Sequence, residues 1–518
     1  MNRSPGPGVP LRSWIALWGA MLGAFMAVLD IQITNSSLPE ILGSLGSTLD
    51  EGSWIQTSYL VSEIIVIPMT AWLASVFGTR RYMLVNTALF LVFSVGCAFA
   101  QSLNGLIVFR VLQGFTGGAL IPMAFTLVLR LLPPGAHPLG FGLFGMTATF
   151  APAVGPTVGG WLTDNMGWPA IFYLNLIPGA IMMVTLAWGL EGEKPRLDLL
   201  RTGNWWGIGT MALGLGSLII FLEEGNRNEW FSSRMITTLG FTAALALTAA
   251  FTIEWRNPRP LVNLRLLTRR NFGLGALVGM AFGFAMYGAA YLLPLYLARV
   301  QGYSAQQIGW TIMWSGAPQL LMMPVAALLL RRVDARLLLA AGLGFFGASC
   351  FVNATLTNLT AYDQLKVAQL LRAVGMPLTI VPLTALATGG IEQDQSGSAS
   401  ALFNMLRNLG GSIGIALLAT QLDWREKFHS VRIGENVSIF AKATEERLAG
   451  LTQYFMGLGA DPLRANDQAV AAIAGIVRRE AFVMSFADCF FIVGVVMTAM
   501  IAAAFLCRPS GSAGAPAH

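Results

Sequence analysis

Charged side chains inside long apolar runs are the residues of this sequence that could do chemistry. Asp30 lies in the run FMAVLDIQITNSSLPE, and Arg110 lies in FRVLQGFTGGALIP. A charge at membrane depth is costly, so such residues usually bind a proton, an ion or a cationic substrate. Asp30 lies roughly seven residues from the outer end of its run, about 10 Å along a helix, and Arg110 lies at a similar depth. We therefore expect an ion pair or a water-bridged contact between them.

A pair of this kind could carry a proton. A guanidinium stabilises the charged form of a neighbouring carboxylate, whereas removal from water favours the neutral form. Movement of one helix would shift this balance and release the proton on one side of a membrane. A static buried pair that only stabilises the helices is the alternative interpretation.

Glu63 is a second acid in an apolar run and lies near its middle, in YLVSEIIVIPMTAW. It could hold a second proton or recognise a cationic substrate. A protonated side chain with a purely structural role is the remaining possibility. Arg372 and Arg407 lie near mid-membrane as well, where they would balance acidic groups, attract anionic parts of a substrate or pack against backbone carbonyls.

Polar and small residues surround these charges in the sequence. The candidate substrate-binding residues are Gln32, Asn35, Gln113, Asn404 and Arg407. The run APAVGPTVGGWL places Gly155, Pro156, Gly159 and Gly160 within two turns. Small residues let helices approach closely, and a proline removes one backbone hydrogen bond and bends the helix. These four residues therefore indicate a helix contact that can move.

The elements that must position these residues follow from the composition. Charged residues make up 11% of the 518 positions, against about 25% in an ordinary soluble domain. Hydrophobic residues reach 55%, and the mean hydropathy is +0.63. The apolar runs recur as about fourteen blocks of roughly 18–25 residues, the length that crosses a bilayer as a helix. The sequence therefore predicts an all-α polytopic membrane protein with fourteen transmembrane helices.

Basic residues predict the orientation of these helices. With the N-terminus in the cytoplasm, the inner segments collect about seventeen Arg and Lys residues and the outer loops about three. Both termini are therefore expected in the cytoplasm. The expected spans are residues 14–36, 53–76, 82–100, 104–129, 139–162, 169–189, 204–222, 235–254, 272–297, 307–330, 337–356, 362–388, 398–421 and 481–506.

An internal repeat divides the spans into two halves. Arg110 and Gln113 in the fourth span correspond to Gln369 and Arg372 in the twelfth, in swapped order and followed by Gly and Pro. Parallel repeats of this kind are typical of transporters built from two six-helix bundles. The expected domains are residues 1–195 for the first bundle, 196–262 for two inserted spans, 263–422 for five spans of the second bundle, 423–480 for an outer helical hairpin, and 481–518 for the last span and tail.

The expected hairpin is the most polar part of the chain, with about sixteen charges, which indicates that it lies in water. Apolar residues at helical spacing precede the turn sequence GADP at 459–462. The hairpin could be a self-packed cover over the outer face, or a docking surface for a partner protein.

Several of these runs resemble the signature motifs of the major facilitator drug:proton antiporters. They are LDIQITNSSLPEI, LIVFRVLQGFTGGALIP and APAVGPTVGGWL. With fourteen spans, the chain resembles the EmrB/QacA branch almost from end to end. The segments GWPAIFYLNLIPG, RRNFGLG and NMLRNLGGSIG are most similar to the EmrB-type multidrug exporters of Gram-negative bacteria.

The resemblance implies roles for particular residues. Asp30 would be the acid that takes up the proton, Arg110 would tune it, and Glu63 matches an acidic position common in the second span of this branch. The four residues of the Gly155–Gly160 motif would govern the rocking of the bundles. The cytoplasmic signature of the family reads AWLASVFGTRR here. Its conformational residues Gly78, Arg80 and Arg81 are present, but Ala71 and Ser75 replace its Gly and Asp, which leaves the charged latch of that motif in doubt.

The implied function is proton-coupled efflux of amphipathic or lipophilic, drug-like compounds across the inner membrane by alternating access. The implied partners are membrane lipid, a periplasmic adaptor of the EmrA type and an outer-membrane channel. The chain has four lysines and no GxxxxGK[ST] loop, so an ion gradient is the expected energy source. No enzyme activity, cofactor, metal or nucleic acid is expected. The alternatives are a uniporter or symporter for a small metabolite and a membrane receptor or scaffold without transport activity.

Overall fold

The structure is a computed structural model that describes residues 9–201, 203–258, 260–438 and 440–508. Every regular element within these ranges is a helix. Thirteen helical segments among the described residues are long and apolar enough to cross a membrane. The helix α7 (His137–Met166), 30 residues long, occupies the place of the expected fifth span. The prediction of an all-α membrane fold is confirmed.

The first bundle is built around α1 (Leu11–Ser36), which packs against α7, α6 (Leu120–Leu131) and α9 (Leu176–Gly189). The fourth expected span is broken into two helices, which are α5 (Leu103–Gly117) and α6 (Leu120–Leu131). The other helices of this bundle are α2 (Leu38–Leu45), α3 (Leu49–Phe77), α4 (Thr79–Ala98), α8 (Ala170–Tyr173) and α9 (Leu176–Gly189). Helix α3 packs on α5, and α4 packs on both α5 and α9.

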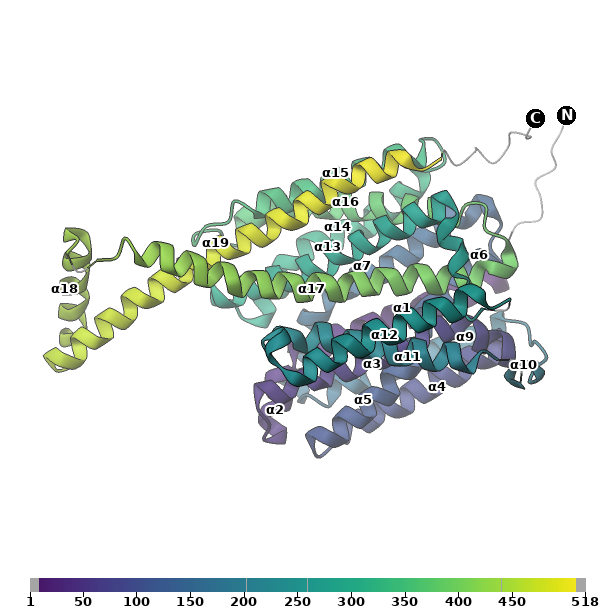
Figure 1. The fold of residues 1–518 in the computed structure, drawn as a ribbon, viewed down its shortest axis with the longest axis horizontal. Helices are drawn as coiled ribbons and strands as arrows, with labels where there is room; N and C mark the ends of the chain where they lie inside the picture. The colour runs from purple at the N-terminus through teal and green to yellow at the C-terminus, as the bar shows by residue number, and fades with distance from the viewer. Residues whose placement is uncertain (1–8, 202, 259, 439, 509–518) are drawn as a thin grey trace.

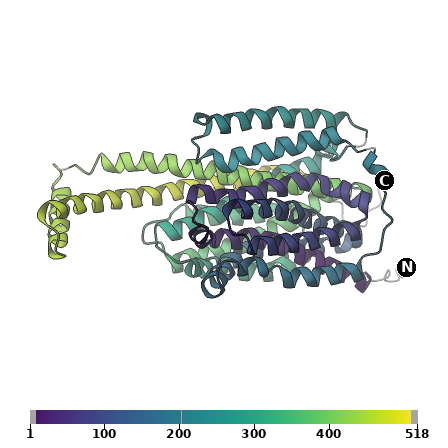
Figure 2. The same ribbon diagram turned by 90° about the horizontal axis from the view of Figure 1, so that it is seen from below.

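Two further long helices lie between the halves of the chain, after the short α10 (Asp198–Arg201). They are α11 (Trp205–Gly225) and α12 (Arg234–Arg256), which pack against each other along their length. Figure 2 shows this pair along one side of the molecule. Helix α11 packs on α3 of the first bundle and also contacts α17 of the second, so it touches both halves.

The second bundle contains the remaining long helices. They are α13 (Arg270–Arg299), α14 (Ala305–Leu329), α15 (Ala335–Asn353), α16 (Tyr362–Thr388), α17 (Ser396–Gly434) and α19 (Pro462–Leu506). Helix α15 packs on α16 and α19, and α13 packs on α17. The two bundles meet where α7 crosses α14 and where α17 crosses α3 and α6.

Two helices extend well past the ends expected for their spans. Helix α17 is continuous for 39 residues and α19 for 45 residues, so their outer parts project from the bundle as an antiparallel pair. The short helix α18 (Lys442–Gly457) lies at the tip of this pair. Figures 1 and 2 show the chain termini at the opposite end of the molecule. We call the two ends the hairpin side and the terminal side.

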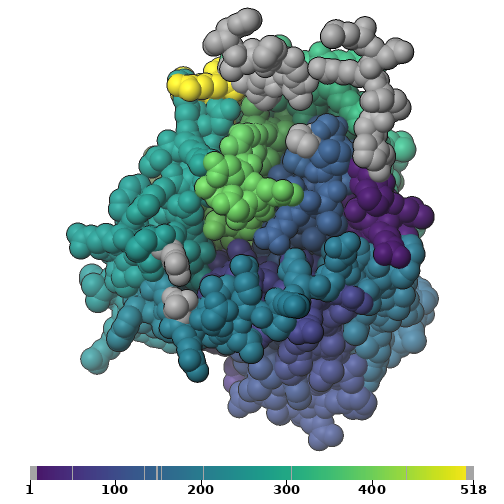
Figure 3. Space-filling model, turned by 90° about the vertical axis from the view of Figure 1, so that its right-hand side faces the viewer, coloured from purple at the N-terminus to yellow at the C-terminus, as the bar shows by residue number. Residues whose placement is uncertain are grey.

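The terminal side is closed by direct contacts between the bundles. The Ser400 hydroxyl donates a hydrogen bond to the carbonyl oxygen of Pro122 (2.7 Å), and the rings of Phe125 and Phe403 lie 5.7 Å apart. At the surface of this side, Gln393 Nε2 donates to the carbonyl oxygen of Arg130 (3.2 Å). Figure 3 faces this end and shows the two halves in contact across it.

Candidate functional site

A cavity of about 1640 Å³ lies between the two bundles. Its deep lining includes Glu63 of α3 and Tyr287 of α13. Its outer lining includes residues 226, 227 and 229–232, between α11 and α12, and Lys427 of α17. The cavity therefore extends toward the hairpin side, whereas the terminal side is sealed. Both bundles and the inserted α11 contribute side chains to it.

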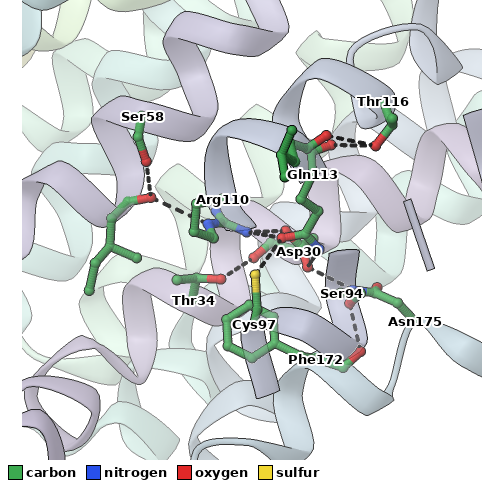
Figure 4. A network of polar contacts seen from close by, with 12 residues as sticks. Asp30, Thr34, Ser58, Ser94, Cys97, Arg110, Gln113, Thr116, Phe172 and Asn175 are labelled. Atoms are coloured by element: carbon green, nitrogen blue, oxygen red, sulfur yellow. Dashed lines mark hydrogen bonds and ion pairs between the residues drawn. The ribbon is translucent and has the colours of Figure 1, made fainter. Parts of the chain in front are cut away.

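Asp30 is the centre of a buried polar network in the first bundle (Figure 4). Its Oδ2 accepts a hydrogen bond from Arg110 Nη1 at 2.5 Å, in an ion pair that is almost completely shielded from solvent. Its Oδ1 accepts hydrogen bonds from Gln113 Nε2 (3.0 Å) and from Asn175 Nδ2 (2.7 Å). The ion pair expected from the matched depths of Asp30 and Arg110 is confirmed. Both carboxylate oxygens are hydrogen-bonded, so the charged form is well solvated by the protein.

The Arg110 guanidinium is held by groups from three helices. Besides Asp30, Nη1 donates to Gln113 Oε1 (2.8 Å) and Nε donates to the carbonyl oxygen of Ile55 (3.3 Å). The guanidinium carbon lies 4.3 Å from the centre of the Tyr59 ring, close enough for a cation–π contact. Its Nη2 is buried and has no hydrogen-bond partner among the described residues.

Glycines explain how Arg110 comes so near α1 and α3. A Cβ atom on Gly114 would collide with the backbone of Tyr59, and one on Gly118 would lie 2.8 Å from the Cα of Glu63. The sequence GFTGG therefore lets the α5–α6 segment approach α3 closely. This approach directs Arg110 to Asp30 and places the break between α5 and α6 beside Glu63.

Glu63 differs from Asp30 in its surroundings. It lines the cavity, is 4% exposed, and its carboxyl forms no hydrogen bond or ion pair within the described part of the chain. Asp30 is equally buried but is not part of the cavity lining. One acid therefore faces the space in which a ligand would bind, and the other is enclosed by protein.

The candidate substrate-binding residues fall into two groups. Gln32 and Asn35 line the cavity from α1. Gln113 belongs to the Asp30 network, and Asn404 donates a hydrogen bond to the carbonyl oxygen of Ser400 (2.9 Å), so neither lines the cavity in this conformation. Arg407 is buried beside the Phe144 ring, 5.7 Å from its centre, also outside the lining.

Buried arginines that form no ion pair with a described residue distinguish the second bundle from the first. Arg407 Nε and Nη1 are buried with no hydrogen-bond partner among the described residues. Arg372, the counterpart of Arg110 in the repeat, donates from Nη2 to the carbonyl oxygen of Met286 (3.4 Å) but has no acidic partner. The repeat is therefore asymmetric, because the enclosed acid and arginine pair occurs in the first bundle alone within the described ranges.

The glycine and proline motif of α7 packs against α1. A Cβ atom on Gly155 would lie 2.5 Å from the Cβ of Gln32, and one on Gly159 would lie 3.1 Å from the Cα of Ile33. Pro156 lies inside the helix and lines the cavity, and Gly160 is partly buried one residue beyond the contact. The residues of α1 that directly follow Asp30 in sequence therefore pack against the backbone of α7.

Replacing Gly155 with Leu is expected to separate α1 from α7. The added side chain has no space beside Gln32, and overpacking of this kind costs about 1–3 kcal/mol. We expect a lower thermal unfolding temperature and a loss of most transport activity. Gly209→Leu is the matched control, because Gly209 lies within α11 with open space beside its Cα. Equal effects of the two variants would contradict a specific α1–α7 contact.

The altered signature AWLASVFGTRR is contacted by an acid from a later segment of the chain. Gly78 connects α3 to α4 with a φ of 83°, a value that favours glycine. The Glu193 carboxylate accepts a hydrogen bond from the backbone N–H of Thr79 (2.9 Å), at the positive N-terminus of α4. Arg80 and Arg81 follow in the first turn of α4. Ala71, in place of the usual glycine, lies against Gly397 of α17 at the closed terminal side.

Three residues of the candidate site are not among those expected from the sequence. Asn175 completes the Asp30 network, and its Nδ2 also donates to the Ser94 hydroxyl (3.0 Å). Glu223 of α11 and Tyr291 of α13 line the cavity. The signals were present, because Asn175 interrupts the apolar segment FYLNLIPG and Glu223 begins an acidic pair directly after the seventh expected span.

Comparisons with known proteins agree with this architecture. Residues 20–415 match the family model of the Major Facilitator Superfamily. The chain is 32% identical over 489 residues to the colistin resistance protein EmrB of Acinetobacter baumannii, which covers 94% of this chain and 95% of that protein. It is 31% identical over 506 residues to the multidrug export protein EmrB of Escherichia coli K12, which covers 96% of each chain.

Solved structures share the fold at low sequence identity. The human organic anion transporter MFSD10 matches with a TM-score of 0.59 and 14% identity, over 94% of this chain and all of that chain. The proton:xylose symporter XylE matches with a TM-score of 0.56 and 12% identity, over 94% of this chain and 95% of that chain. The resemblance expected from the sequence motifs is therefore confirmed by the family model and the relatives, and the solved structures confirm the fold.

Proposed function

Because the chain belongs to the Major Facilitator Superfamily, we propose that it is a proton-coupled multidrug exporter that works by alternating access. As a member of this family it is a multi-pass membrane transporter rather than an enzyme. The relatives named for colistin resistance and multidrug export support drug-like compounds as the substrates. Their similarity extends over nearly the whole chain, including the hairpin.

The observation that carries this proposal is the separation of the two acids. Glu63 faces the cavity and its carboxyl forms no hydrogen bond or ion pair with a described residue, so it is available to a cationic or hydrogen-bonding substrate. Asp30 lies behind the lining, paired with Arg110. A substrate in the cavity and a proton on Asp30 therefore occupy different places on α1 and α3, which can influence each other through small movements of these helices.

The proposed cycle uses these two places in turn. In the conformation described, the cavity extends to the hairpin side and the terminal side is sealed. With both termini in the cytoplasm of a bacterial inner membrane, this is an outward-open state. Protonation of Asp30 weakens its pairing with Arg110 and favours rocking toward the inward-open state. Substrate bound at Glu63 favours the return to the outward-open state. The proton and the substrate each shift the equilibrium because each binds the two states with different affinity.

The hairpin supports a role in a larger export assembly. Its tip carries exposed apolar side chains, among them Phe440 and Leu463, far from the cavity. Exposed apolar surface of this kind marks sites of protein contact. We include in the proposal a periplasmic adaptor protein, docked on this hairpin, and an outer-membrane channel that the adaptor would reach.

Replacing Glu63 with Gln tests the role of the cavity acid. In proteoliposomes with an imposed proton gradient, we expect transport of the cation tetraphenylphosphonium to fall by about tenfold or more, because its buried counter-charge is lost. Transport of a neutral lipophilic compound should fall much less. Glu51→Gln, at the exposed start of α3, is the control. An equal loss for the cation and the neutral compound would contradict cation recognition by Glu63.

A uniporter or symporter for a small metabolite is the alternative function, because it would share the fold. The two functions predict opposite responses to a protonophore in whole cells. Collapse of the proton gradient should raise the accumulation of an exported drug, whereas it should lower or leave unchanged the uptake of a metabolite.

A further inference from the structure

The inserted helix α11 contributes an acid to the cavity. Glu223 and Glu224 lie next to each other near its outer end. The Glu224 carboxylate accepts a hydrogen bond from the Thr57 hydroxyl (2.9 Å), which ties α11 to α3. Glu223, one residue earlier, lines the cavity instead. The pairing of Glu224 therefore fixes the rotation of α11 that presents Glu223 to the space between the bundles.

The Glu223 carboxyl has capacity for a ligand. Its Oε1 is buried and has no hydrogen-bond partner among the described residues. Ser412 of α17 lies on the other side of the same carboxyl, and Tyr291 of α13 is close to it in the lining. These neighbours can hydrogen-bond to a carboxylate but cannot neutralise it. Arg227, a basic residue of the lining, follows Glu223 by four positions and already has an interaction partner of its own.

Glu63 and Glu223 lie at different depths in the cavity. Thr57, which marks the level of Glu224 on α3, precedes Glu63 by six residues, about 9 Å along a helix. Two tyrosines of α13 follow the same direction, because Tyr287 and Tyr291 are one turn apart and both line the cavity. The cavity thus contains two acids at different depths and a wall of aromatic rings beside them.

We propose that Glu223 is a second cation-recognition residue, and that the cavity binds dicationic aromatic amphiphiles with one charge at Glu63 and the other at Glu223. This inference rests on the proposed function, which supplies cation binding at Glu63. It adds a substrate class and gives a role to the inserted pair of helices. A rigid separation between two acids selects for ligands whose two charges have a matching separation.

The remaining charged groups of the lining lie nearer the mouth and are partly satisfied. The Asp423 carboxylate accepts a hydrogen bond from Asn226 Nδ2 (2.8 Å). Besides Arg227, the other charged side chains of the outer lining are Glu229 and Lys427, which have opposite charges. The described lining has no unpaired basic side chain beside Glu223, whereas the buried Arg407, outside the lining, interacts electrostatically with Glu63. The surroundings of Glu223 therefore favour a ligand that carries positive charge. The tyrosine rings add cation–π and stacking contacts to aromatic cations.

The test compares a monovalent cation with bivalent cations that carry two copies of the same charged group. The purified protein is titrated calorimetrically with methyltriphenylphosphonium and with two triphenylphosphonium groups joined by alkane linkers of increasing length. For wild type, we expect affinity to peak at one linker length. Glu223→Gln should weaken binding of that compound by about tenfold and remove the peak, while it changes binding of the monovalent cation by less than about twofold.

Two other variants make the outcome decisive. Glu40→Gln, at an exposed position of α2 on the same side, should leave both affinities unchanged. Glu63→Gln should weaken both classes of cation. Equal weakening of the monovalent and bivalent cations by Glu223→Gln, or the absence of any linker preference in wild type, would overturn the inference about Glu223. If wild type bound the cations without selectivity and Glu63→Gln changed neither affinity, the proposed function itself would be refuted.

Discussion

Replacing Asp30 with Asn is expected to abolish drug-dependent proton release. Asn nearly preserves the shape of the side chain and can still bond to Gln113 and Asn175, but it cannot take up and release a proton. The protein reconstituted in vesicles should release no protons on addition of drug, and transport driven by a proton gradient should fall to the background rate. A pH-sensitive dye on the outside of the vesicles provides the measurement.

The single variant also leaves Arg110 as a buried charge without its ionic partner. Breaking a buried pair in this way costs about 3–5 kcal/mol, so reduced stability could imitate a loss of coupling. The double variant Asp30→Asn, Arg110→Gln removes both charges and should recover much of the stability, but no coupling. Asp164→Asn, at an exposed position of α7, is the control for a change of charge alone. Normal export by the double variant under a proton gradient would refute the role of Asp30.

Shortening the hairpin is expected to separate transport from resistance in cells. The Arg478 guanidinium pairs with the Glu426 carboxylate (3.5 Å), which shows that the two arms are level at this point. Residues 434 and 470 are each eight positions further toward the tip, so a short Gly-Ser connector can replace residues 435–469 without changing the register of the arms. This variant should transport drug normally in vesicles but should confer no resistance to whole cells, because the adaptor surface is gone.

Point substitutions locate the surface more narrowly. Phe440 is 92% exposed and Leu463 is 81% exposed, values unusual for large apolar side chains in water. Changing both to Ser should reduce resistance in cells and leave vesicle transport unchanged. Asp467→Ala, an exposed polar position on the same arm, is the control. Loss of vesicle transport in the shortened protein would indicate that the hairpin is needed for folding instead.

The position of a charged residue along its hydrophobic run correctly predicts its depth in the helix bundle. Counting residues from the end of a hydrophobic run placed Asp30 and Arg110 at the same level, and the structure pairs them. This works because rise per residue is constant in a helix, so sequence position becomes depth. The same counting could not show that Asn175 and Gln113 share the carboxylate, since their contact depends on the relative rotation of helices α1, α5 and α9.

The ends of two helices differ from the expected span ends, at the places where the helices leave the apolar bundle. Helices α17 and α19 continue far past the apolar parts of their sequences, because a polar amphipathic helix can continue from an apolar one without a break. Hydropathy detects the change of solvent and not the end of the helix. For the same reason the seventh span was ended one residue before Glu223, and this acid was overlooked.

The sequence by itself determined the class of protein and two of the acids that lie at membrane depth, Asp30 and Glu63. These are local properties, set by hydrophobicity over about twenty residues and by the cost of burying charge. The tertiary structure decided which of those acids faces the cavity. Asp30 is enclosed and Glu63 and Glu223 are open to ligand, because glycine contacts and the Thr57–Glu224 hydrogen bond set how neighbouring helices are rotated, and rotation about a helix axis leaves no trace in hydropathy.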